Sequence, residues 1–166
     1  LIINCKDINT LHCYSDSDFA GDITDRHSTS GYALFLGKGL VSWRSSKQYM
    51  VSTSTMEAEY VALNVALKEA IALSAIYNEI IGKKPELIIY CDNNAAIEII
   101  QNSKYRSKTK HIDIQYHFAK QHYKIGTYKL ERVDSSCNPA DIMTKPLDPN
   151  NFMNNARKLG ITNSKF

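Results

Sequence analysis

The amino-acid sequence predicts an α/β fold: a five-stranded mixed sheet, three antiparallel strands followed by parallel additions, with helices on both faces. Three observations lead to this prediction. The chain opens with β-prone runs that include a hairpin pattern, a long segment of helical periodicity follows, and a short, almost wholly apolar run comes next. Such an apolar run is typical of a strand that is covered on both faces.

The antiparallel strands are expected in the N-terminal part of the chain. Residues 11–19 form the first, and a polar turn region separates it from two further β-prone runs, at 32–36 and 40–43. The loop Gly37-Lys-Gly39 joins these two runs, and its glycines can take positive φ. The pattern therefore predicts three consecutive antiparallel strands.

Residues 56–81 have the period of a helix, because apolar residues recur at alternating spacings of four and three. Gly82 followed by Pro85 supplies the stop signal. The inward-facing stripe is expected to consist of Glu59, Leu63, Ala66, Ala70, Leu73, Tyr77 and Ile80.

The second half of the chain alternates strands and helices. Strands are expected at 87–91 and 128–133, and helices at about 94–101 and 109–123. Asn138-Pro139 and Asp148-Pro149 each combine an N-cap residue with a proline suited to a first helical turn, so each predicts a helix start. At 166 residues the chain suits a single domain over residues 1–166, ending in a helix and tail at 148–166.

The composition indicates the cellular compartment of the protein but not its function. The four cysteines are scattered without a Cys-x-x-Cys pair, which favours a reducing, intracellular compartment. With no signal-like segment and no 18-residue apolar segment, a soluble protein that does not interact with membranes is expected, and the start at Leu1 suggests a piece of a longer polypeptide. A formal charge of +3 does not by itself indicate a nucleic-acid partner.

Four acidic residues are the strongest functional signal: Asp16 in a strand, Glu59 in an apolar helical stripe, Asp92 after a buried strand, and Asp141 at a helix start. A carboxylate among core elements is costly unless it is paired or bound to a cation. Such carboxylates would repel one another by up to about 4 kcal/mol per pair at an effective dielectric near 20, and divalent cations would cancel that repulsion. Oxygen ligands favour Mg²⁺ or Mn²⁺, and two such ions suit phosphodiester cleavage.

Each acid also has an ordinary structural alternative. Glu59 and Asp141 could be first-turn acids favoured by a helix dipole, and Asp92 could be an N-cap. Asp18 shares the strand face of Asp16 and competes with it for the site. The joint pattern favours a site, because ligands of open α/β sheets bind at the carboxyl ends of the strands.

Six sequence blocks resemble the ribonuclease H domain of copia-type LTR retrotransposon polyproteins, in that family's order, over about residues 11–147. The blocks are Tyr14-Ser-Asp-Ser-Asp-Phe-Ala-Gly-Asp22, Arg26-His-Ser-Thr-Ser-Gly-Tyr32, Ser54-Thr-Met-Glu-Ala-Glu-Tyr-Val-Ala-Leu63, Tyr90-Cys-Asp-Asn-Asn94, Thr109-Lys-His-Ile-Asp-Ile-Gln-Tyr-His-Phe118 and Ala140-Asp-Ile-Met-Thr-Lys-Pro-Leu147.

This resemblance implies a ribonuclease H fold and endonucleolytic cleavage of the RNA strand of RNA–DNA hybrids during reverse transcription, leaving 5′-phosphate and 3′-hydroxyl ends. It also implies two Mg²⁺ ions, with Mn²⁺ as a substitute. Asp16 would bridge the two metals, Glu59 and Asp92 would complete one shell, and Asp141 would bind the other ion.

Contacts to the hybrid are expected at two places. In the basic run 104–111, Arg106, Lys108, Lys110 and His111 could neutralise phosphates, although a solvated loop is an equal alternative. Ser54 and Asn93 lie near the predicted acids and could contact the DNA-strand phosphate and the 2′-hydroxyls.

Some residues of the recognised blocks receive other expectations. For His111 and His117, helix packing or phosphate contact is preferred to metal ligation. The loop 134–138 lacks the histidine found in cellular and retroviral relatives. The aromatic side chains Tyr32, Phe35 and Trp43 are expected in the strand core rather than in base stacking.

The leading function is therefore an active retroelement ribonuclease H. A catalytically silent module that positions nucleic acid or braces a polymerase domain is the main alternative, and an integrase on the same fold is a third. The expected partners are the RNA–DNA hybrid and the reverse transcriptase domain of the same polyprotein. The expected location is the cytoplasm, within retrotransposon virus-like particles.

Overall fold

The computed structural model describes residues 8–102 and 110–161, and for residues 110–116 it describes the backbone only. Five strands form one sheet in the order β3-β2-β1-β4-β5. β1, β2 and β3 make the antiparallel meander, β4 pairs parallel to β1, and β5 pairs parallel to β4. The predicted mixed sheet is confirmed. The strands are β1 (Thr10–Asp18), β2 (Thr29–Leu36), β3 (Gly39–Lys47), β4 (Glu86–Cys91) and β5 (Lys129–Arg132).

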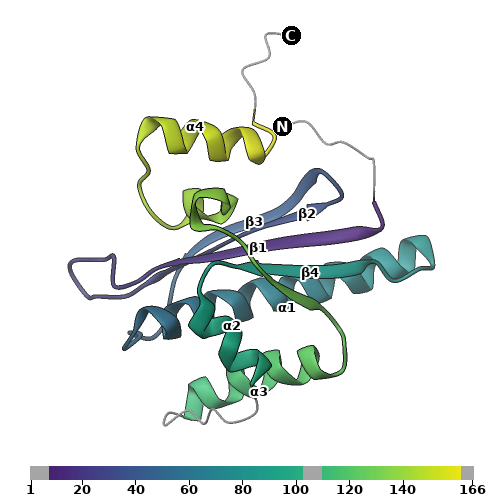
Figure 1. Cartoon of the computed structure of the whole chain (residues 1–166), viewed down its shortest axis with the longest axis horizontal. Helices are drawn as coiled ribbons and strands as arrows, with labels where there is room; N and C mark the ends of the chain where they lie inside the picture. The colour runs from purple at the N-terminus through teal and green to yellow at the C-terminus, as the bar shows by residue number, and fades with distance from the viewer. Residues whose placement is uncertain (1–7, 103–109, 162–166) are drawn as a thin grey trace.

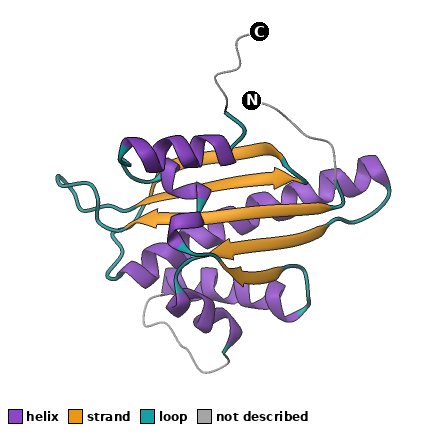
Figure 2. Cartoon of the chain, turned by 45° about the horizontal axis from the view of Figure 1, so that its top comes forward, coloured by secondary structure: helices purple, strands orange, loops and turns teal. Residues whose placement is uncertain are grey.

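Helices cover both faces of the sheet, as predicted. Figures 1 and 2 show α1, α2 and α3 on one face, and α4 with the short 3₁₀ segments on the other. The helices are α1 (Thr55–Ile81), α2 (Asn94–Gln101), α3 (Lys110–Lys124) and α4 (Pro149–Lys158), and the 3₁₀ segments are η1 (Ser135–Cys137) and η2 (Pro139–Met143).

Most of the core lies between α1 and the sheet. Leu63 and Leu67 of α1 are fully buried against Leu11, Leu34 and Ile89 of the three central strands. The expectation that no 18-residue apolar segment is present is wrong: by length and composition α1 is apolar enough to cross a membrane, and half of its apolar window is buried inside the fold. The apolar residues of α1 that face the sheet are those of a core helix.

Helix starts follow the predicted capping chemistry. The side chain of Asp148 accepts hydrogen bonds from the backbone N–H groups of Asn150 and Asn151, and Pro149 opens α4. Asn138 caps the segment that begins at Pro139, but that segment is a 3₁₀ helix of five residues rather than an α-helix. The short, tight segment matters because it carries Asp141.

Two side chains lie elsewhere than expected. Ile80 is 75% exposed, because the last turns of α1 are little covered by the sheet, and Trp43 is 55% exposed on the outer strand β3. Asn64 of α1 is a buried polar residue, at 1% exposed, and its Nδ2 donates to the Tyr60 carbonyl one turn earlier.

Candidate active site

The parallel pairing of β1 and β4 brings two of the predicted acids to one edge of the sheet. Tyr14 is paired with Tyr90 in the parallel register, so Asp16 and Asp92 each lie two residues further toward the carboxyl ends of adjacent strands. Glu59 reaches the same edge from the second turn of α1, and Asp141 reaches it from η2 on the other side. Residues far apart in the sequence therefore meet at one place.

The acids form two overlapping groups. Asp16, Asp92 and Asp141 offer ligand atoms that all lie within 4.8 Å of one another, and so do Glu59, Cys91 and Asp92. Asp92 is common to both groups. The resemblance implied Asp16 as the bridging residue, and that assignment stays a prediction.

A dense set of contacts holds Asp16 and Asp141 in place. Asp16 is 1% exposed, and Thr144 Oγ1 donates a hydrogen bond to its Oδ2. Lys145 Nζ lies 3.3 Å from Asp141 Oδ1 and 3.7 Å from Asp16 Oδ2. Asn138 Nδ2 donates to the Ser15 carbonyl at 2.9 Å, which ties the start of η2 to β1.

Gly31 allows η2 to approach the sheet this closely. It is the β2 partner of Asp16, and a Cβ at this position would lie 2.6 Å from Thr144 Cγ2 and 2.8 Å from Met143 Cβ. Real Cβ atoms do not make such short contacts with carbon. A side chain here would push η2, and with it Asp141, away from Asp16.

Glu59 is buried, and only part of its hydrogen-bonding capacity is used. It is 4% exposed, and Oε1 accepts a hydrogen bond from the Ser17 backbone N–H at 3.2 Å. Oε2 is buried without a hydrogen-bond partner among the described residues. The acid of the first turn of α1 is Glu57, so the first-turn explanation does not account for Glu59.

Burial and mutual repulsion favour protonation of these carboxyl groups. Burial, assisted by the charges of Asp16 and Asp92, raises the pKa of Glu59 from 4.5 to about 8. Burial also raises the pKa of Asp16 from 3.8 to about 7, against the opposing hydrogen bond from Thr144, and it raises the pKa of Asp141. A bound divalent cation would reverse this, because it stabilises the ionised form of every carboxylate that it contacts.

Two of the alternative explanations do not hold. Asn93, not Asp92, is the N-cap of α2, since its side chain accepts a hydrogen bond from the Ala96 N–H at 3.0 Å. Asp18 is half-buried and belongs to neither ligand group. The first-turn position of Asp141 is real, but it coexists with the acidic group rather than replacing it.

Ser54 caps α1, because its Oγ accepts a hydrogen bond from the Glu57 N–H at 3.2 Å. We expect Ser54→Ala to lower the free energy of unfolding by about 1 kcal/mol. Ser54→Asn keeps a capping oxygen and should retain most of that stability. Urea denaturation of both variants checks this, and equal losses for the two would contradict the capping role. The suggested phosphate contact of Ser54 stays a prediction.

The predicted basic contacts are not tested by the structure. Arg106 and Lys108 lie outside the described residues, and Lys110 and His111 lie in the first turn of α3, where only the backbone is described. His117 is exposed on α3, and it belongs to neither of the two ligand groups.

The prediction from sequence missed three residues of the site. Thr144 and Lys145 contact Asp16, and Cys91 lies beside Glu59 and Asp92. The available signal was their position inside two of the recognised blocks, next to Asp141 and Asp92 respectively. Threonine, lysine and cysteine are common residues that no sequence pattern singles out here, so only their contacts in the folded chain identify them as part of the site.

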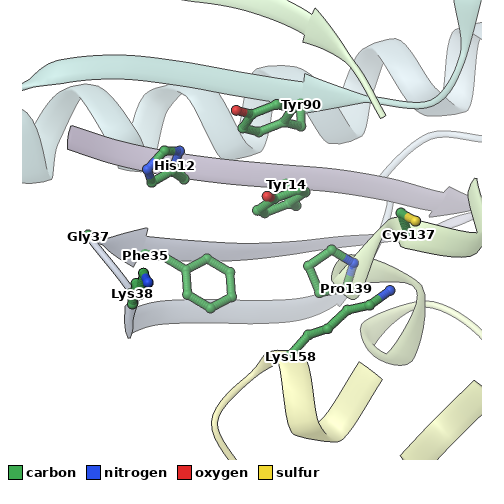
Figure 3. A pocket seen from close by; sticks show the side chains of 9 residues that line it. All are labelled: His12, Tyr14, Phe35, Gly37, Lys38, Tyr90, Cys137, Pro139 and Lys158. Carbon is green, nitrogen blue, oxygen red and sulfur yellow. The ribbon is translucent and has the colours of Figure 1, made fainter. Parts of the chain in front are cut away.

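A separate hollow of about 410 Å³ lies on the sheet face that carries α4. Figure 3 shows the rings of Tyr14 and Tyr90 side by side above β1 and β4, with Phe35 and Pro139 facing them. The two tyrosine rings are stacked at 4.7 Å between centroids. None of the four candidate carboxylates lines this hollow, so it is distinct from the acidic site.

Comparison with known proteins agrees with this geometry. The chain is 39% identical over 142 residues to the retrovirus-related Pol polyprotein from transposon TNT 1-94 of Nicotiana tabacum, which covers 86% of the chain and 11% of the polyprotein. It is 38% identical over 156 residues to the Pol polyprotein from transposon RE1 of Arabidopsis thaliana, covering 92% of the chain and 10% of the polyprotein. The chain thus spans about a tenth of the length of these relatives.

The fold has solved counterparts. The chain superposes on LC11-RNase H1, solved in complex with an RNA/DNA hybrid, with a TM-score of 0.59 at 17% identity, covering 81% of this chain and 93% of that one. No protein-family model matches the sequence.

The sheet order, the helices on both faces and these solved counterparts define a protein of the ribonuclease H fold. Among such proteins, the chain belongs with the ribonuclease H domains of retrotransposon Pol polyproteins, as its sequence resemblance implied.

Proposed function

We propose that the chain is a metal-dependent ribonuclease H that cleaves the RNA strand of RNA–DNA hybrids during the reverse transcription of a copia-type LTR retrotransposon. The observation that carries this proposal is the meeting of Asp16, Glu59, Asp92 and Asp141 at the carboxyl ends of β1 and β4. Three of these carboxylates are buried and Asp92 is half-buried, so their charges repel one another unless cations bind, and bound cations could take part in phosphodiester cleavage.

The residues present fit divalent cations. Asp16, Asp92 and Asp141 form an all-oxygen set that suits Mg²⁺, with Mn²⁺ as a substitute. Glu59 and Asp92 are the carboxylates of the second group, and the buried, unpartnered Oε2 of Glu59 is available as a ligand. When bound, two such ions supply an activated water and stabilise the leaving oxygen of a phosphodiester.

The surrounding side chains would hold these carboxylates in position before cations bind. Thr144 and Lys145 hold Asp16 in position, and the Asn138 contact keeps η2, which carries Asp141, against β1. Lys145 is 37% exposed and ion-paired with both carboxylates, so it partly offsets their repulsion before cations bind. Preorganised ligands lose less conformational freedom on binding than mobile ones.

The substrate class is inferred from the relatives. A structural counterpart was solved with an RNA/DNA hybrid, and the sequence relatives are Pol polyproteins of transposons. We therefore propose the hybrid as substrate and the reverse transcriptase domain of the same polyprotein as partner. Cleavage in the cytoplasm, within virus-like particles, is part of the same proposal.

The decisive experiment incubates the purified chain with end-labelled RNA–DNA hybrid, RNA duplex and DNA duplex, each with Mg²⁺, with Mn²⁺ or with a chelator. We expect internal cuts in the RNA of the hybrid only, with 5′-phosphate ends, and none with chelator. Cleavage of duplex DNA instead would favour an integrase-like nuclease.

The main alternative is a silent module that binds nucleic acid without cutting it. Tight hybrid binding with no cleavage in either metal, at a protein concentration that saturates the hybrid, would support that alternative. The buried carboxylate groups argue against it, because a purely binding surface has no use for unpartnered acidic oxygens such as Glu59 Oε2.

A further inference from the structure

We propose that Glu59, Cys91 and Asp92 form a sulfur-containing metal subsite that binds Zn²⁺ or Cd²⁺ in preference to Mg²⁺. This would make the two halves of the acidic site chemically different. Asp16, Asp92 and Asp141 offer oxygen alone, whereas Cys91 adds Sγ to the second group, with all three ligand atoms within 4.8 Å of one another.

The positions of the three side chains follow from the fold. Cys91 is the last residue of β4, and its backbone carbonyl accepts a hydrogen bond from the Val133 N–H at 3.1 Å, which fixes the strand end. Asp92 follows directly and is half-buried, so the cluster is open on the side of Asp92. Glu59 approaches from α1 with one oxygen held by Ser17.

Glu59 provides a second indication that a cation belongs here, and the proposed Mg²⁺ site shares this indication. The side chain is 4% exposed, and its Oε2 has no hydrogen-bond partner among the described residues. Leaving a buried polar atom unsatisfied costs roughly 1–3 kcal/mol, and more for a charged group. A cation held jointly by Glu59, Cys91 and Asp92 would satisfy this oxygen.

Cys13 shows what a merely structural cysteine looks like in the same core. Cys13 and Cys91 are both 0% exposed, and they belong to the same hydrophobic cluster between the sheet and α1. Each sulfur lies near a backbone carbonyl oxygen, 3.9 Å from that of Ala66 for Cys13 and 4.0 Å from that of Asn93 for Cys91, but Cys13 belongs to neither ligand group. Burial therefore explains Cys13, but it does not explain two carboxyl groups beside Cys91.

Ligand softness sets the expected metal preference. Thiolate sulfur favours Zn²⁺ and other thiophilic ions, whereas Mg²⁺ takes oxygen ligands. Two carboxylates and one thiolate make three protein ligands, which leaves a fourth tetrahedral position open. The thiol releases its proton to solvent when the metal–sulfur bond forms.

A consequence for activity rests on the proposed nuclease function. Zn²⁺ held at this subsite by sulfur would displace Mg²⁺ from Glu59 and Asp92, so low concentrations of Zn²⁺ would slow hybrid cleavage. The metal-binding proposal itself does not depend on that activity and is tested without it.

The experiment titrates the full chain with Cd²⁺ and follows the ultraviolet sulfur-to-cadmium charge-transfer band, in a Cys5→Ser, Cys137→Ser background that removes the thiols outside the core. Cys137 is exposed, and Cys5 lies outside the described residues. We expect a saturable band at one equivalent, absent in Cys91→Ala and unchanged in Cys13→Ala. Zn²⁺ affinity, measured by calorimetry, should fall roughly tenfold or more in Cys91→Ala. Loss of a side chain that only hydrogen-bonds to a metal ligand already lowers metal affinity by that factor, and Cys91 would be a ligand itself.

The outcomes separate the two proposals. A band that persists in Cys91→Ala, or Cd²⁺ binding with no band in the parent, would overturn the sulfur subsite whatever the activity. A Cys91-dependent band in a chain that cleaves no hybrid would support the subsite and count against the nuclease. Circular dichroism of each variant shows that the fold is retained, and if Cys91→Ala is unfolded, Cys91→Ser replaces it with an oxygen of similar size and should abolish the band equally.

Discussion

Asp92→Asn is expected to abolish Mg²⁺-dependent cleavage of RNA–DNA hybrid while the fold is retained. Asp92 is the one residue that belongs to both ligand groups, so its replacement weakens both at once. A metal-ion contribution of several kcal/mol to the transition state corresponds to a fall in rate of at least roughly a thousandfold. Asparagine has nearly the same shape, and Asn93 rather than Asp92 caps α2, so the helix should not be disturbed.

The matched control is Asp18→Asn, in the same region of the molecule but outside both groups. It should cleave at close to the parental rate. Single-turnover cleavage of labelled hybrid measures both variants, and thermal unfolding confirms that both are folded. A folded Asp92→Asn variant with near-parental cleavage would falsify the proposed site.

Glu59→Gln is expected to stabilise the metal-free chain and to do so increasingly as the pH rises. The pKa of Glu59 is raised to about 8 in the fold, mainly by burial, from an ordinary value of 4.5. The folded state therefore binds the proton more tightly than the unfolded state, so stability falls as the pH rises from about 4.5 to 8. Glutamine removes this loss, which we expect to be on the order of 5 kcal/mol at the alkaline end.

The measurement is chemical denaturation in chelator across this pH range. Parent and variant should be equally stable below about pH 4.5, and the variant should be more stable above about pH 8. Glu79→Gln, an exposed position on the same helix, should show no such divergence. With saturating Mg²⁺ the order should reverse, because only the parent keeps Glu59 as a ligand and gains full stabilisation from metal binding. If the stability of parent and Glu59→Gln depended on pH in the same way, a raised pKa of Glu59 would be ruled out.

Much of the fold was predictable because its signals are local. Gly37 and Gly39 around Lys38 predicted the hairpin between β2 and β3, and the helix at 94–101 was predicted with its observed bounds. Capping residues such as Asp148 and Asn138 act on backbone groups two or three positions away, so sequence neighbours suffice to identify them. The exposures of Trp43 and Ile80 were wrong, because cover by other elements is not a local property.

The sequence by itself determined which acids to consider. Aspartate and glutamate at core positions are unfavourable enough to be conspicuous, and the recognised blocks supported the choice of Asp16, Glu59, Asp92 and Asp141. It could not exclude Asp18 as a rival to Asp16 or a capping role for Asp92, since each fits the local pattern equally well.

Only the tertiary structure decided how those acids are arranged. The parallel register of β1 and β4 places Asp16 beside Asp92, and the bare backbone of Gly31 lets η2 bring Asp141 and Lys145 against them. The sulfur of Cys91 became part of the site in the same way. Distances between side chains that are tens of residues apart depend on strand register and helix packing, which are properties of the whole fold and not of any segment of the sequence.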